Sequence, residues 1–179
     1  MQIKSNFANR GMTLEDDLNC TCLFYLETGK AVIHKKPTTI GIAKVSFQSS
    51  NQKRIKDGFF KAPSTTDYNG VWNGKYIDFE AKETKSKTSF PISNIHDHQI
   101  KHMTRVLNQN GICFLVIRFS ALDKTFVYFA TDLISFIKNN KRKSIPFDEF
   151  KQNGFEVKIK FQPRIDFLTI IERIYKEEK

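Results

Sequence analysis

The sequence predicts one α/β domain, built as a mixed central β-sheet flanked by helices. Three observations favour this class. Helical and extended segments alternate along the chain, segment 111–117 is almost entirely apolar, as in a strand buried on both faces, and 40% of the 179 residues are apolar. Because a chain of this length has room for one core, we expect a single domain at 13–179, preceded by a flexible basic arm at 1–12.

The first helix is predicted to begin after Thr13, whose hydroxyl suits an N-cap. Acidic residues at 15–17 follow in the first turn, where negative charge is favourable beside exposed N–H groups. Apolar residues then recur at helical spacing, and Gly29 is typical of a helix end. A short strand is expected at 31–34, stopped by Pro37.

Segment 38–62 predicts an extended two-stranded excursion, because its apolar residues alternate but are too few for the main core. Its tip at 49–52 is polar, and basic residues outnumber acidic ones. Two interpretations remain open at this point, a solvated loop and a protrusion that reaches into nucleic acid. The candidate DNA-binding residues of the chain are Arg10, Lys44, Lys53, Arg54, Lys56, Lys61 and Lys85.

A β-hairpin is expected around the turn at 70–74, followed by a strand at 75–82. Alternation places Ile77, Phe79 and Ala81 on the core face of this strand. The opposite face carries Asp78, Glu80 and Lys82.

The remaining elements follow from periodicity and from turn residues. A second helix is expected at 94–109, with Ile95, Gln99 and Met103 near one face. The later predictions are strands at 111–117 and 125–129, a helix capped by Thr131 and Asp132, a basic run at 138–143, a short helix at 146–153, an alternating strand at 156–161 and a closing amphipathic helix at 164–177.

The charge balance indicates a polyanionic partner, since 29 Lys and Arg against 19 Asp and Glu give a net charge of +10. Nucleic acid and an anionic membrane surface are the candidates. No apolar stretch approaches the roughly 20 residues of a membrane span, and the N-terminus lacks the apolar block of a signal peptide. Three cysteines fit a reducing compartment. We therefore expect a cytoplasmic protein without a membrane partner.

Asp67 stands at the entrance to the strand before the one that carries Glu80 and Lys82. Two carboxylates from neighbouring strands and one lysine form a minimal phosphodiester-cleaving site. The carboxylates suit Mg²⁺, which lowers the pKa of a bound water, and the lysine offsets charge in the transition state. The alternative is a solvated Glu-x-Lys ion pair on an exposed strand face.

The order of Asp67 and then Glu80-Ala81-Lys82 resembles the PD-(D/E)XK nuclease superfamily. Longer strings are similar to the RecU family of bacterial Holliday junction resolvases over nearly the whole chain. They are Asn9–Glu15, Ala31–Pro37, Thr65–Gly70, Tyr76–Lys85, Thr88–Pro91, His96–Ile100 and Pro163–Asp166. Thr66 stands where the superfamily pattern has proline, a departure that RecU proteins share.

The resemblance implies a restriction-endonuclease-like nuclease fold and Mg²⁺, with Mn²⁺ as a substitute, bound by Thr65, Asp67, Glu80 and Gln99. It assigns the transition-state lysine to Lys82. From the residues alone, Gln99 would be read as an ordinary surface hydrogen-bonding residue. The resemblance also implies a homodimer that makes paired symmetric nicks in four-way DNA junctions during recombination and repair. It makes segment 38–62 a protruding two-stranded stalk that enters the junction centre.

Further candidate partners implied by the resemblance are a RecA-type recombinase and a branch-migration helicase, at the nucleoid. Glu15 and Asp78 are candidates to support the site from beside the ligands, although Glu15 equally serves the helix dipole. Two other functions remain open. One is a related repair nuclease that cuts linear duplex DNA, and the other is a non-catalytic DNA-binding or strand-annealing modulator of a recombinase.

Overall fold

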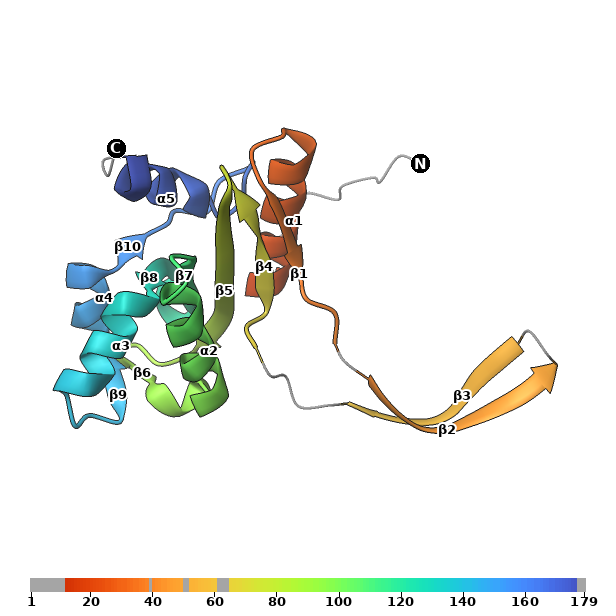
Figure 1. Cartoon of the computed structure of the whole chain (residues 1–179). Helices are drawn as coiled ribbons and strands as arrows, with labels where there is room; N and C mark the ends of the chain where they lie inside the picture. Colours follow the sequence, from red (N-terminus) through yellow and green to blue (C-terminus); the bar gives the residue numbers. More distant parts are fainter. Residues whose placement is uncertain (1–11, 39, 50–51, 61–64, 177–179) are drawn as a thin grey trace.

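A mixed six-stranded sheet lies at the centre of this computed structural model, which describes residues 12–38, 40–49, 52–60 and 65–176 (Figure 1). In spatial order its strands are β1 (Val32–Lys35), β4 (Tyr68–Trp72), β5 (Lys75–Thr84), β7 (Ile112–Phe119), β8 (Lys124–Phe129) and β10 (Phe155–Glu156). β5 and β7 are parallel, and the other neighbouring pairs are antiparallel. The predicted mixed sheet is confirmed.

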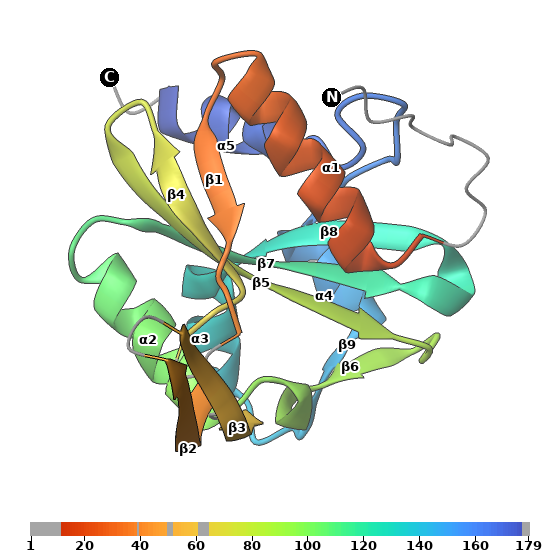
Figure 2. The same ribbon diagram turned by 90° about the vertical axis from the view of Figure 1, so that its right-hand side faces the viewer.

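Helices cover both faces of this sheet, as predicted (Figures 1 and 2). They are α1 (Leu14–Glu27), α2 (Asp97–Leu107), α3 (Ala130–Asn139), α4 (Phe147–Asn153) and α5 (Phe167–Lys176). Two short strands, β6 (Ser89–Pro91) and β9 (Ser144–Pro146), pair separately, and single 3₁₀ turns occur at Ile92–Asn94 and Ser120–Leu122. Among the described helices, none has the length and apolar character that crossing a bilayer would need.

Strand β7 is buried along its whole length, which explains its apolar sequence. Alternate residues such as Phe114 and Val116 pack in the core beneath α1 and α5. Their neighbours, such as Leu115 and Ile117, pack in a second core with α2, α3 and α4. The sheet therefore separates two hydrophobic cores, and a polar residue on either face of its centre has to find a partner there.

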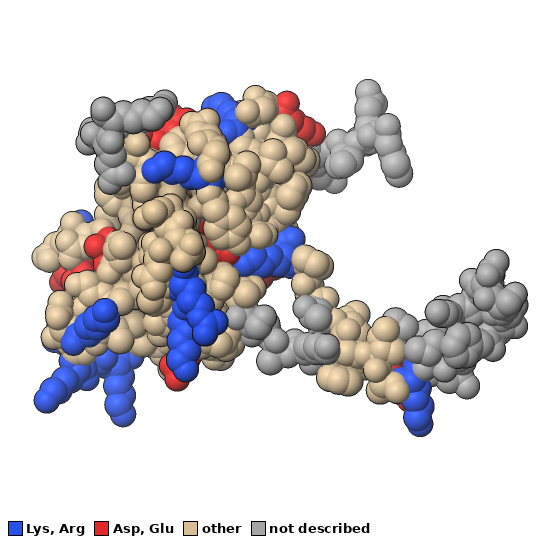
Figure 3. All heavy atoms as spheres, viewed as in Figure 1, with Lys and Arg blue, Asp and Glu red and all other residues tan. Residues whose placement is uncertain are grey.

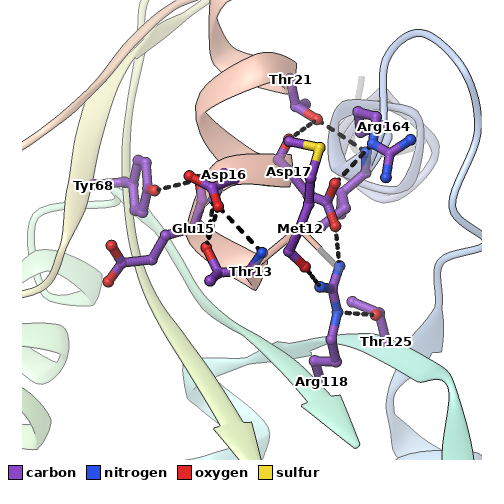
Figure 4. A network of polar contacts seen from close by, with 11 residues as sticks. Met12, Thr13, Glu15, Asp16, Asp17, Thr21, Tyr68, Arg118, Thr125 and Arg164 are labelled. Atoms are coloured by element: carbon purple, nitrogen blue, oxygen red, sulfur yellow. Dashed lines mark hydrogen bonds and ion pairs between the residues drawn. The ribbon is translucent and has the colours of Figure 1, made fainter. Parts of the chain in front are cut away.

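The N-terminal helix is tied to the body by a buried carboxylate, Asp17, which is 1% exposed (Figure 4). Arg118 of β7 pairs with it through Nη2, and Arg164 donates from Nε at 2.7 Å. Arg118 also reaches the carbonyl oxygen of Met12 at 3.3 Å. One turn further, the Thr21 hydroxyl accepts the N–H of Ile165 at 2.9 Å. The start of α1 is thus joined to β7 and to the segment before α5.

The predicted stalk is present as a separate two-stranded sheet of β2 (Ile40–Ser49) and β3 (Gln52–Phe60). It is inserted between β1 and β4, and Figure 1 shows it extending away from the body. The apolar side chains of Ile40, Ile42 and Phe59 are exposed, so these described side chains of the hairpin lie outside the main core.

Several predicted boundaries differ from the structure. The second helix begins at Asp97 rather than 94, because Ile92–Asn94 forms a 3₁₀ turn first. Helix α3 is capped by Phe129, so Thr131 and Asp132 lie inside its first turn. The strand predicted at 156–161 ends at Glu156. The chain beyond it forms a turn in which the N–H of Lys160 donates to the carbonyl of Arg164. The closing helix begins at Phe167 rather than 164.

Candidate functional site

The β4–β5 hairpin brings the two predicted acids together. Its turn places Asn73 and Gly74 at φ 47° and 75°, as a two-residue hairpin turn requires, and aligns Tyr68 with Phe79. Asp67 immediately precedes β4 and thus lies beside Glu80. The N–H of Asp67 donates to Oε2 of Glu80 at 3.1 Å. The N–H of Ala81 donates to Oδ2 of Asp67 at 3.1 Å, so each carboxyl group is held by a backbone N–H of the neighbouring segment.

Two further predicted residues converge on the other oxygen of Glu80. Nζ of Lys82 and Nε2 of Gln99 each lie 2.7 Å from Oε1. Gln99 projects from the buried face of α2, and its amide oxygen accepts the N–H of His96 at 3.0 Å. An amide oxygen has a second lone pair, so Gln99 retains a donor atom for a cation.

Burial sets the electrostatics of Glu80, whose residue is 0% exposed. Burial and the negative charge of Asp67 raise the pKa of its carboxyl, Lys82 opposes both effects, and the resulting pKa is about 7. Two carboxyl groups this close need positive charge to remain ionised together. In the described residues, no three His, Cys, Asp or Glu side chains form a metal-binding group, so a divalent ion here would take its other ligands from hydroxyl, amide, backbone or water oxygens.

The raised pKa of Glu80 predicts a pH-dependent stability in chelator. A carboxyl with a raised folded-state pKa stabilises the fold below its ordinary value of 4.5, and this contribution is lost as pH rises to about 7. Glu80→Gln should therefore match the wild type near pH 4.5 and melt a few degrees higher at pH 8. Thermal unfolding across this range measures the difference.

Glu83→Gln is the matched control for this measurement, because Glu83 is exposed on the same strand. The melting temperature of Glu83→Gln should differ from that of the wild type by the same small amount at every pH in this range. A Glu80→Gln curve parallel to the wild type at every pH would contradict the account of Glu80.

Asp78 is buried rather than solvent-facing, and it organises the segment around Asp67. Its Oδ2 receives Lys36 Nζ at 2.8 Å, the Tyr76 hydroxyl at 2.9 Å and His102 Nε2 at 3.2 Å. Its Oδ1 accepts the Thr66 hydroxyl. Asp78 therefore joins the residue before Asp67 to α2, and its role in supporting the site stays a prediction.

Lys36 holds the same segment twice. Its Nζ donates to the Thr66 hydroxyl at 2.9 Å, and its backbone N–H donates to the carbonyl of Asp67 at 2.7 Å. Sequence reasoning missed Lys36, Thr66 and His102 as parts of this arrangement, because their contacts join distant segments and follow no local period.

The other proposed site residues are less closely joined to Glu80. Thr65 is half-buried, and its hydroxyl lies 3.5 Å from the carbonyl of Thr66. Glu15 pairs with Lys35 and borders a hollow of about 300 Å³ that Ala81 and Glu83 also line. A position beside β5 does not decide whether Glu15 supports the metal site or stabilises the dipole of α1. Its role in the site therefore stays a prediction.

The predicted DNA contacts fall into three groups. Lys44 and Lys85 are exposed, and Lys44 lies 3.9 Å from Asp57. Lys53, Arg54 and Lys56 belong to β3, but their side chains lie outside what the structure describes. Arg10 and Lys61 lie outside the described residues altogether.

The fold and the site define an α/β protein in which the half-buried Asp67 and the buried Glu80 lie beside a lysine and an amide. Residues 9–173 match the RecU family, described as Recombination protein U. The match covers nearly the whole chain. The chain therefore belongs to this family.

Relatives similar to the chain carry one shared name, Holliday junction resolvase RecU. The one from Geobacillus sp. (strain WCH70) is 51% identical over 173 residues, covering 95% of this chain and 86% of that protein. Those from Oceanobacillus iheyensis and Bacillus subtilis (strain 168) are each 50% identical, covering 94% and 95% of this chain and 88% and 83% of those proteins.

A solved structure of Archaeoglobus fulgidus Hjc, described as a Holliday junction resolvase, aligns with a TM-score of 0.45 at 11% identity. The alignment covers 82% of this chain and 95% of that one. Similarity at this level is too low to decide function.

Proposed function

We propose that the protein is a Mg²⁺-dependent endodeoxyribonuclease that resolves Holliday junctions by paired symmetric nicks in homologous recombination and DNA repair. Family membership and the names of relatives at about half identity support this function. The observation that carries the chemistry is the buried Glu80, held between Asp67, Lys82 and Gln99.

The donor set fits a hard divalent cation. Asp67 and Glu80 supply carboxylate oxygens, and Thr65 and Gln99 supply hydroxyl or amide oxygens, which are the ligands that Mg²⁺ prefers. Bound there, Mg²⁺, or Mn²⁺ in its place, would supply Lewis-acid polarisation of the scissile phosphate and acidify a water. The raised pKa of Glu80 supports the fit, because a cation removes the electrostatic cost of ionising that carboxyl beside Asp67.

Lys82 contributes positive charge at the reacting phosphate. Its side chain is 22% exposed, so the ammonium lies where a substrate can reach it, although it pairs with Glu80 in the free protein. A fixed cation at this place offsets the negative charge that builds up on the phosphate oxygens in the transition state. Asp78, Lys36 and Thr66 would keep the segment that carries Asp67 in position through their mutual hydrogen bonds.

The single nuclease domain at 13–179, with its arm at 1–12, would act as a homodimer, because two symmetric nicks require two sites related by a two-fold axis. The β2–β3 stalk would enter the branch point of the junction, with its basic residues and Arg10 contacting phosphates. A RecA-type recombinase and a branch-migration helicase are the proposed protein partners, and the proposed location is the cytoplasm at the nucleoid.

A nicking assay on end-labelled DNA tests this function. With Mg²⁺, the wild type should cut four-way junctions into paired nicked duplexes, and chelator should stop the reaction. Equal cutting of linear duplex would favour the related repair nuclease. Junction binding without any cutting, over a range of Mg²⁺ and Mn²⁺ concentrations, would favour the non-catalytic modulator.

The same assay with residues 46–56 deleted tests the stalk. The deletion lies outside the body, so it should reduce the preference for junctions over linear duplex while the protein stays dimeric. Loss of the dimer with junction preference intact would reverse the roles assigned to the stalk and body.

A further inference from the structure

A polar hollow of about 370 Å³ lies between α2 and α3, away from Glu80. Hydroxyl and amide side chains dominate its lining, together with one lysine. The lining residues are Thr104, Leu107, Asn108, Thr131, Ile134, Ser135, Lys138 and Asn139. Ser135 accepts Asn139 Nδ2 at 3.2 Å, which leaves its own hydroxyl hydrogen free to donate.

Exposed cations lie on the two helices that line this hollow and in the segment after α3. Lys101 and Arg105 are exposed on α2, and Lys138 is followed by an exposed basic run after α3. Figure 3 shows basic side chains gathered over α2 and over the lower end of the body near α3 and β9. The full set is Lys101, Arg105, Lys138, Lys141, Arg142 and Lys143, and we call it, with the hollow, the α2–α3 surface.

The charges of the α2–α3 surface are uncompensated. Elsewhere in the described residues, lysines commonly lie in ion pairs; examples are Lys35, Lys36, Lys82, Lys124 and Lys160. Within the same described ranges, none of the six cations of this surface is in such a pair. The acids on the two helices are Asp97 and Asp132, and Asp132 lines a neighbouring hollow with Glu149. Cations therefore exceed acids on this surface.

The basic run is also held in place. The carbonyl of Lys143 accepts the N–H of Ile92 at 3.0 Å, and Pro91 pairs with Ser144 across the β6–β9 sheet. The run is thus fixed next to the segment that leads into α2. A ligand that binds a run with an anchored backbone meets a smaller ordering cost than one that binds a loose loop.

We infer that the α2–α3 surface binds the sugar–phosphate backbone of a duplex arm of the substrate. Lysine, arginine, hydroxyl and amide groups together are the set that contacts phosphate and sugar without reading sequence. The identification of this duplex as an arm of a four-way junction rests on the proposed function. α2 gives the contact a use, because its inner face presents Gln99 to Glu80 while its outer face carries Lys101 and Arg105.

The test compares two charge-matched variants of the full chain. The surface variant is Lys138→Gln/Lys141→Gln/Arg142→Gln. The control is Lys30→Gln/Lys75→Gln/Lys158→Gln, whose residues follow α1, begin β5 and follow β10. Fluorescence anisotropy without divalent metal measures binding to four-way junctions with arms of about 25 base pairs and with arms of about 8, less than one helical turn.

On long arms at about 0.1 M salt, the surface variant should bind at least about 10-fold more weakly than the wild type. Its slope of log affinity against log salt should be shallower by about 2 to 3, for three lost phosphate contacts. The control should change less than about 3-fold, and on short arms the surface variant should approach the wild type. Ser135→Glu, which puts a negative charge in the hollow, should repeat the long-arm loss.

If the surface variant bound long-arm junctions with the affinity and salt slope of the wild type, the inference would be overturned. Loss of binding to an acidic protein by that variant would not rescue it, because the surface would then serve a protein partner. An equal loss in the control would also overturn it, since the effect would then follow net charge. Failure of the wild type to prefer four-way junctions over linear duplex would count against the proposed function instead. Circular dichroism melting of each variant confirms that the fold is retained.

Discussion

Glu80→Ala is expected to lower the rate of junction nicking by at least about a thousandfold, equivalent to about 4 kcal/mol of transition-state stabilisation. The substitution removes a carboxylate that contacts the Asp67 N–H, Lys82 and Gln99 at once. Any cation held by the site would lose a ligand, and Lys82 would lose the group that positions it. Single-turnover nicking at saturating Mg²⁺ measures this loss.

Binding separates this effect from unfolding. Glu80→Ala should still bind four-way junctions in chelator with an affinity close to that of the wild type, because the cations proposed to contact phosphates are untouched. Glu83→Gln should nick at the wild-type rate, because Glu83 is exposed on the same strand, three residues after Glu80. If Glu80→Ala resolved junctions at the wild-type rate, the proposed site would be wrong.

Asp17→Ala is expected to destabilise the protein by about 3–5 kcal/mol, which is a fall in melting temperature of about 10 °C for a chain of this size. The change leaves Arg118 and Arg164 without their common carboxylate, and their side chains are 9% and 16% exposed. An unpaired buried cation costs far more than the pair itself contributes. Thermal or urea unfolding measures the loss.

Glu27→Ala is the control, because it removes an exposed acid from the end of the same helix. It should change stability little. Asp17→Ala protein that remains folded at low temperature should nick junctions, since Asp17 is not among the groups around Glu80. A melting temperature within about 2 °C of the wild type would show that the Asp17 network does not hold α1 in place.

Much of the fold could be predicted where one local pattern dominates. Thr13 caps α1 as expected, with its hydroxyl accepting the N–H of Asp16 and the Asp16 carboxylate accepting the N–H of Thr13. The apolar run at 111–117 is a strand buried on both faces. Boundaries were less predictable where an irregular turn decides them, as after β10, where the N–H of Lys160 donates to the carbonyl of Arg164 instead of continuing a strand.

The candidate site was predictable in part. Asp67, Glu80 and Lys82 follow from alternation and hairpin pairing, and the structure brings them together. Gln99 could have been found from one signal, because it shares the buried face of α2 with Met103, and a lone amide there needs a polar partner. Asp17 gave no such signal, since an acid in the first turn of a helix is already explained by the helix dipole.

The bonds among Lys36, Thr66 and Asp78 close the neck of the inserted hairpin. Lys36 precedes β2 by a few residues, and Thr66 lies where the chain returns from β3, so both ends of the insertion are fastened at one place. The inserted hairpin beyond these hydrogen bonds can lengthen, shorten or change its residues while Asp67 and Glu80 keep their spacing. Under the proposed function, the hairpin would determine substrate preference and the body would carry the cleavage chemistry, so the two can evolve separately.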